Sequence, residues 1–116
     1  MLYTELVIGN ETYKLRLNTR ASVALEKTLG KSPLAVFMEI DAGEMPKLTD
    51  MLAILQACLQ PYHHGFTMDK TYDLFDQFIA DGKTLFDLIP VFIEVFQESG
   101  YISKAGTDSE DANGKN

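Results

Sequence analysis

The sequence predicts a mainly α-helical fold of the α+β class, with an N-terminal β-hairpin, about five helices and a disordered C-terminal tail. Three observations indicate this fold. Apolar and polar residues alternate over positions 2–17 around Gly9-Asn10, five later stretches carry apolar residues at helical spacing, and residues 104–116 lack large apolar side chains. We expect residues 1–103 to form a single globular domain, because a chain of 116 residues buries about two thirds of its unfolded surface.

The hairpin prediction includes the register of its strands. Gly9-Asn10 suits a two-residue turn, which pairs Ile8 with Glu11. With this pairing, Glu5 lies opposite Lys14 on one face, and the other face is mainly apolar. The residues predicted on the apolar face are Leu2, Thr4, Leu6, Tyr13, Leu15 and Leu17. Two strands alone are barely stable, so this face must pack on helices or continue into another subunit.

Helices are expected at about 20–29, 33–42, 49–60, 68–80 and 85–98, from apolar periodicity and from residues that favour helix ends. The predicted starting residues are Thr19, Ser32-Pro33, Thr49 or Asp50, Thr67, and Thr84 with Asp87 as a capping box. Glycines follow most of these stretches, as is common after helix C-termini. Pro90 lies inside the last helix and predicts a kink, or a late start near Asp87.

The most apolar stretch is Leu85–Phe96, whose nine apolar side chains cover an arc of roughly 220° on a helix. A surface helix needs about half of that arc. Two interpretations follow, and the sequence does not choose between them. Either the rest of the chain wraps this helix completely, or Phe86, Phe92 or Ile93 contacts a second protein.

No pattern in the sequence predicts a catalytic, metal or cofactor site. His63-His64 has no metal ligand at a usual spacing, and Cys58 lies on the apolar face of a predicted helix, where a buried and inert thiol is expected. Asp69, Asp73 and Asp76 share one helix face without the glycine and glutamate of a calcium loop, so a solvated face is expected. We therefore expect a protein that is not an enzyme and needs no cofactor.

The charge and composition of the chain exclude some classes of partner and indicate a cellular compartment. The net charge of −7 and the scattered basic residues argue against binding to nucleic acid or to an anionic membrane surface. A single cysteine excludes an internal disulfide and fits a reducing compartment. The sequence has no signal peptide pattern and no apolar stretch of membrane-spanning length, so we expect a cytoplasmic protein.

A family resemblance goes further than the residue chemistry. The chain resembles the tail assembly chaperones of long-tailed, siphovirus-type phages and prophages of Gram-positive bacteria, over nearly all of residues 1–103. The stretches that carry the resemblance are Tyr13-Lys-Leu-Arg-Leu17, Ala24-Leu-Glu-Lys-Thr-Leu-Gly30, Leu48-Thr-Asp-Met-Leu-Ala-Ile-Leu55, Thr67-Met-Asp-Lys-Thr-Tyr-Asp-Leu74, Asp87-Leu-Ile89 and Glu94-Val-Phe-Gln-Glu-Ser-Gly100.

The resemblance implies a helical, non-enzymatic protein of the host cytoplasm that coats the tape-measure protein and helps recruit tail tube subunits during tail morphogenesis. It also implies self-association and absence from the mature virion. Members of that family are often made in two lengths by ribosomal frameshifting. Because Gly114-Lys115-Asn116 fits an adenine-rich coding run, we expect this chain to be the short product.

Other functions stay open at this stage. A second phage morphogenesis component, or another helical protein-interaction module, would have the same sequence patterns. A small DNA-binding regulator is disfavoured by the acidic balance and the lack of a basic recognition helix. An enzyme subunit whose site forms only between subunits would be recognised by a bound metal or cofactor.

Overall fold

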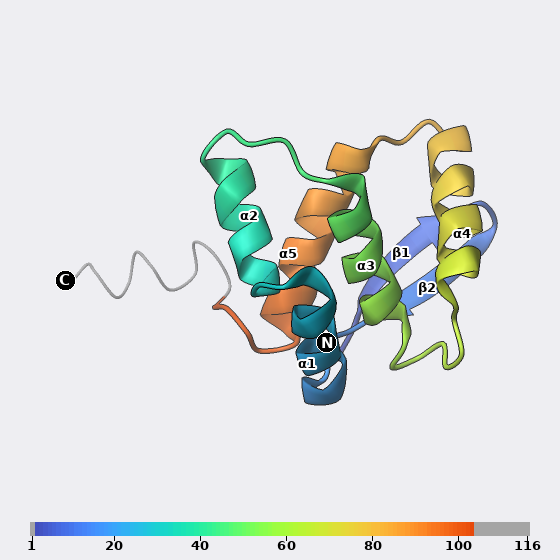
Figure 1. Cartoon of the computed structure of the whole chain (residues 1–116). Coiled ribbons are helices and arrows are strands. Elements are labelled where there is room, and N and C mark those ends of the chain that lie inside the picture. Colours follow the sequence, from blue (N-terminus) through green and yellow to red (C-terminus); the bar gives the residue numbers. More distant parts are fainter. Residues whose placement is uncertain (1, 104–116) are drawn as a thin grey trace.

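A computed structural model describes residues 2–103 and confirms the predicted fold class (Figure 1). An antiparallel hairpin is followed by five α-helices, with one short 3-10 helix before the last of them. The elements are β1 (Thr4–Ile8), β2 (Glu11–Leu15), α1 (Thr19–Leu29), α2 (Pro33–Asp41), α3 (Leu48–Leu59), α4 (Met68–Ala80), η1 (Leu85–Asp87) and α5 (Leu88–Glu98). The tail that we predicted to be disordered, residues 104–116, lies outside the described residues.

The hairpin has the predicted register, with Ile8 opposite Glu11 and Glu5 opposite Lys14. Gly9 has a φ of 64°, the positive value that a primed turn requires at its first central residue. The strands are shorter than predicted, because the ladder ends at the pair of Thr4 and Leu15. The prediction that Leu2 lies on the buried face is wrong, because Leu2 precedes the ladder and its side chain is exposed.

The tip of the hairpin is tied to the end of α4. The backbone N–H of Gly9 donates a hydrogen bond of 2.6 Å to Oδ2 of Asp81, which follows the last residue of α4. The side chain of Gln77 donates to the other oxygen of the same carboxylate at 2.8 Å. The hydrogen bond from Gly9, together with the one from Gln77, stabilises the charged form of the Asp81 carboxyl group and lowers its pKa. This contact fixes the outer end of the sheet against α4.

The predicted helix starts are correct for α2 and α4 and need correction for α1 and α3. Ser32 and Thr67 cap α2 and α4 with their side-chain oxygens, as expected. The residue that caps α1 is Asn18 rather than Thr19, and its Oδ1 accepts the N–H of Ala21 at 2.8 Å. The third helix starts earlier than predicted, at Leu48, and no side chain caps it.

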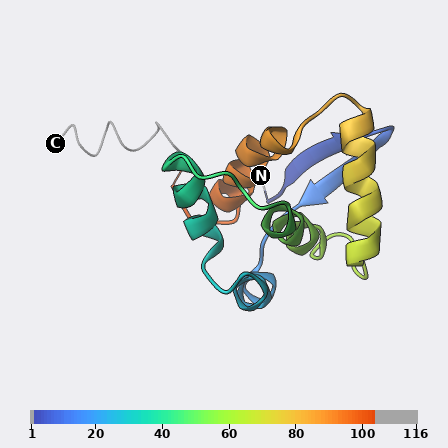
Figure 2. The same cartoon turned by 45° about the horizontal axis from the view of Figure 1, so that its top comes forward.

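The core is centred on α3 rather than on the most apolar stretch. Eight of the twelve residues of α3 are buried. Figure 2 shows α3 in the middle of the domain, with α1, α4, α5 and the sheet around it. The sheet contributes Leu6, Ile8 and Leu15 to this core, since its apolar face packs inward. A small α-helical domain thus encloses one central helix on most of its sides.

The exposed face of α4 is wider than the sequence indicated. Leu74 and Phe78 are buried with Thr71, whose hydroxyl donates to the carbonyl oxygen of Thr67 at 2.9 Å. Two other large apolar residues of this helix, Tyr72 and Ile79, are about half exposed. Fewer residues of α4 are buried than its apolar residues would suggest, because only one side of this helix packs on the core.

Pro90 has the effect that the sequence predicted. The chain first forms the 3-10 helix Leu85–Asp87, and the α-helix begins at Leu88, so Pro90 lies in the first helical turn. A proline costs little there, since the first N–H groups of a helix have no partner within it. Thr84 and Asp87 form the predicted capping box, in which the N–H of Thr84 donates to Oδ2 of Asp87 at 2.7 Å.

Candidate binding groove

The apolar helix α5 is wrapped by the chain on only part of its surface. Its fully enclosed side consists of Leu88, Phe92, Val95 and Phe96, each at most 2% exposed. Its remaining apolar residues are partly buried. The rest of the chain therefore covers one side of α5 completely and leaves apolar residues on the other side only partly covered.

The three residues predicted to contact a partner lie in three different environments. Phe92 is completely buried, with its ring edge-on to that of Phe37 at a centroid distance of 6.3 Å, so it is a core residue. Phe86 is 49% exposed on the 3-10 helix. Ile93 is partly buried and lines an open groove beside α5. Of the three predicted residues, only Ile93 belongs to this groove.

The groove lies between α2 and α5 and has a volume of about 540 Å³. Its surface is mostly apolar, which distinguishes it from the other large hollow, a mixed polar and apolar one between the hairpin and α4. The residues that line it are Leu34, Phe37, Met38, Asp41, Ala42, Ile93, Phe96 and Ile102. We call this feature the α2–α5 groove. An open apolar hollow of this kind is typical of surfaces that bind a helix or a peptide.

One wall of the groove is α2, which aromatic contacts hold against α5. The ring of Phe37 packs edge-on against Phe96 at a centroid distance of 5.2 Å, in addition to its contact with Phe92. The next residue, Met38, also lines the groove, but its side chain is 72% exposed. The sequence showed that this helix is apolar but gave no sign that Met38 would remain uncovered.

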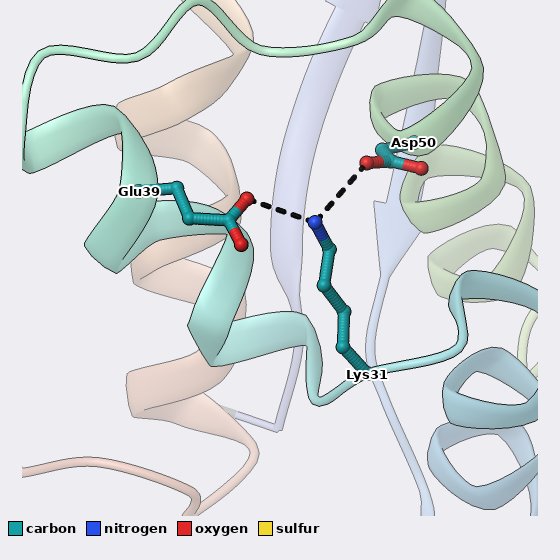
Figure 3. Close-up of polar contacts among 3 residues, drawn as sticks. All are labelled: Lys31, Glu39 and Asp50. Carbon is teal, nitrogen blue, oxygen red and sulfur yellow. Dashed lines mark hydrogen bonds and ion pairs between the residues drawn. The ribbon is translucent and has the colours of Figure 1, made fainter.

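A cluster of charged groups also fixes α2. Lys31, between α1 and α2, places its Nζ atom 2.8 Å from Oε1 of Glu39 on α2 and 3.8 Å from Oδ2 of Asp50 on α3 (Figure 3). The hydrogen bond to Glu39, with the negative charges around it, raises the pKa of Lys31. The ammonium group therefore bridges α2 and α3 from the segment that precedes α2.

The segment after α5 also contributes to the groove. Ile102 lines the groove, and the residue before it, Tyr101, is held by a hydrogen bond of 2.9 Å from the hydroxyl of Ser22 on α1. The hydroxyl of Ser99 accepts the N–H of Leu17 at 3.0 Å. These two bonds attach the segment that carries Ile102 to the body of the domain.

The residues considered for chemistry have structural roles where the structure describes them. Nε2 of His63 accepts the backbone N–H of Lys14 at 3.1 Å, and burial together with the charge of Lys14 lowers the pKa of this imidazole. Cys58 is fully buried, which raises its pKa far above the usual range and keeps it a neutral thiol. Within residues 2–103, no group of three or more His, Cys, Asp or Glu could hold a metal ion.

The fold is that of a small, mainly helical protein with an open apolar groove between α2 and α5. Residues 3–115 match the model of DUF6096, a family of unknown function, so the chain belongs to that family. No curated protein and no solved structure matches the chain. In the part of the chain that the structure describes, no helix is both long enough and apolar enough to cross a membrane.

Proposed function

We propose that this chain is a tail assembly chaperone of a siphovirus-type phage or prophage, which binds the tape-measure protein and helps recruit tail tube subunits. The observation that carries the proposal is the apolar α2–α5 groove with its exposed Met38. A tape-measure protein is long and helical, and its apolar stripe needs cover before the tail tube assembles around it. A groove of this shape is suited to hold one face of such a helix.

The sequence resemblance supplies the identity of the partner, and the fold is compatible with it. The chaperone would act without catalysis in the cytoplasm of the host bacterium and would be absent from the finished virion. Met38, Ile93 and Phe37 would provide the contact surface. Methionine suits a surface that must accept many different apolar side chains, because its thioether chain is flexible and polarisable. Such adaptability is useful when one chaperone binds a repetitive helix at several positions.

Self-association belongs to the same proposal, and the outer edge of β1 is the surface that favours it. The outer edge of β2 is occupied, since the N–H of Lys14 donates to His63 and the N–H of Arg16 donates to the carbonyl oxygen of Cys58 at 2.9 Å. The N–H of Lys14 points away from β1, and so that of its partner Glu5 points away from β2. Val7 lies two residues further along β1, so its N–H points in the same outward direction. Among the described residues, neither N–H has a hydrogen-bond partner. An open edge of this kind templates strand addition.

The proposal is tested by co-expressing the full chain with the tape-measure protein encoded in the same genome. We expect the tape-measure protein to stay in the soluble fraction and to co-purify with the chain. A tape-measure protein that aggregates equally with and without the chain would contradict the proposal. The absence of a very long coiled-coil gene beside this one would instead favour the alternative, which is another helical protein-interaction module.

A further inference from the structure

Over the described residues, the lining of the α2–α5 groove carries a negative charge and no positive one. Asp41 is the only charged residue among those that line the groove. It is exposed and is the last residue of α2, and the last turn of that helix contains no basic residue. The carbonyl oxygens of Met38, Glu39 and Ile40 at this end of α2 accept hydrogen bonds from the backbone N–H groups of residues 42–44, so the Asp41 carboxylate is the exposed negative group here. Asp41 therefore gives this end of the groove a negative charge.

From this charge and the apolar lining we infer that the α2–α5 groove binds an amphipathic helix that carries lysine or arginine beside its apolar stripe, at the end that meets Asp41. The inference rests on the proposed function and specifies the kind of helix that the groove accepts. The apolar stripe would lie on Met38, Ile93 and Phe37, and the basic side chain would reach the carboxylate. An acidic helix would face both Asp41 and the net charge of −7 of the chain.

The pairing would act at the rim of the groove, where water is present. A charge pair at such a site adds specificity and association rate more than affinity, and salt weakens it. The affinity itself would come from the apolar contact at Met38 and Ile93. The two contributions are therefore separable by changing the salt concentration and by changing the charge at Asp41.

The test uses two synthetic helical peptides with the same apolar face, one flanked by lysine and one by glutamate. Their binding to the full chain is measured by fluorescence anisotropy at low and high salt. We expect the lysine peptide to bind about tenfold more tightly at low salt, with the difference shrinking at high salt. Asp41→Lys should abolish or reverse this preference. Asp76→Lys, an exposed acid on α4, makes the same change in net charge and should leave the preference intact.

The outcomes separate this inference from the proposed function. Equal binding of the two peptides, or an equal effect of both lysine substitutions, would overturn the charge preference while leaving tape-measure binding in place. If neither peptide binds but the tape-measure protein co-purifies, the groove is the wrong site and the inference fails. If the lysine peptide is preferred and Asp41→Lys reverses this, the inference stands even when the tape-measure protein does not co-purify. Dispersal of an oligomer by Met38→Glu, without any peptide binding, would show that a second copy fills the groove and would overturn it.

Discussion

Phe92 and Ile93 are neighbours in the sequence, yet Phe92 is completely buried against Phe37 while Ile93 lines the open α2–α5 groove. We expect Phe92→Asp to unfold the domain, because an unpaired buried charge costs several kcal/mol. Ile93→Asp should retain the helical circular dichroism spectrum and lose binding at the groove. A folded Phe92→Asp variant would show that this side chain is not part of the core.

The hydroxyl of Thr4 offers a stabilising substitution. Thr4 is 3% exposed, and its Oγ1 has no hydrogen-bond partner among the described residues. Thr4→Val keeps the shape and removes the unpaired polar atom, so it should raise the free energy of unfolding by about 1 kcal/mol in urea denaturation. Thr71→Val is the matched control, since its buried hydroxyl is bonded to the carbonyl oxygen of Thr67 and its loss should not stabilise. A Thr4→Val variant no more stable than the parent would indicate that the hydroxyl is satisfied in solution.

The bond between Gly9 and Asp81 predicts a specific acid sensitivity. Since the N–H of Gly9 lowers the pKa of Asp81, the folded state favours the carboxylate, and its stabilising effect is present above the ordinary pKa of an aspartate. This effect is lost as the pH falls through the lowered pKa. In urea denaturation at several pH values, Asp81→Asn should therefore lose stability at neutral pH and differ little from the parent in strong acid. Asp76→Asn, on the exposed side of α4, should not change this dependence.

The open edge of β1 predicts how the protein self-associates. Val7→Lys places a charge on a strand edge, which disfavours pairing with another strand. The side chain is 60% exposed, so the monomer should remain folded. Light scattering should show a smaller species than for the parent at the same concentration. Thr12→Lys, opposite Val7 on β2, is the control that should keep the parent's size, and a strict monomer in the parent would remove the basis for this prediction.

The sequence predicted the elements whose signals are local. The register of the hairpin followed from Gly9-Asn10 and the alternation around it, and the late start of α5 followed from Pro90. The cap of α1 was placed one residue late, because Asn18 and Thr19 are both good N-cap residues and the sequence does not rank them decisively. Errors of this size concern single residues at helix ends.

The groove could be predicted only in part. The surplus of apolar residues in Leu85–Phe96 raised the question of whether some of them remain uncovered, without deciding it, and Ile93 is one that lines the open groove. Which side of α5 stays open depends on where α2 packs, and that is set by Phe37 and by the contacts of Lys31 with Glu39 and Asp50. These contacts join separate helices, so no periodicity within one helix reveals them.

The most direct test of the groove as the tape-measure site compares two exposed methionines. Met38 is 72% exposed and lines the α2–α5 groove, whereas Met45 is 75% exposed and lies outside it. Because both side chains are mostly exposed, we expect each to tolerate a charge, so that Met38→Glu and Met45→Glu differ mainly in position. In co-purification and binding assays with the tape-measure protein, Met38→Glu should weaken binding at least tenfold, about 1.4 kcal/mol, and Met45→Glu should bind like the parent. Equal binding by both variants would contradict the account.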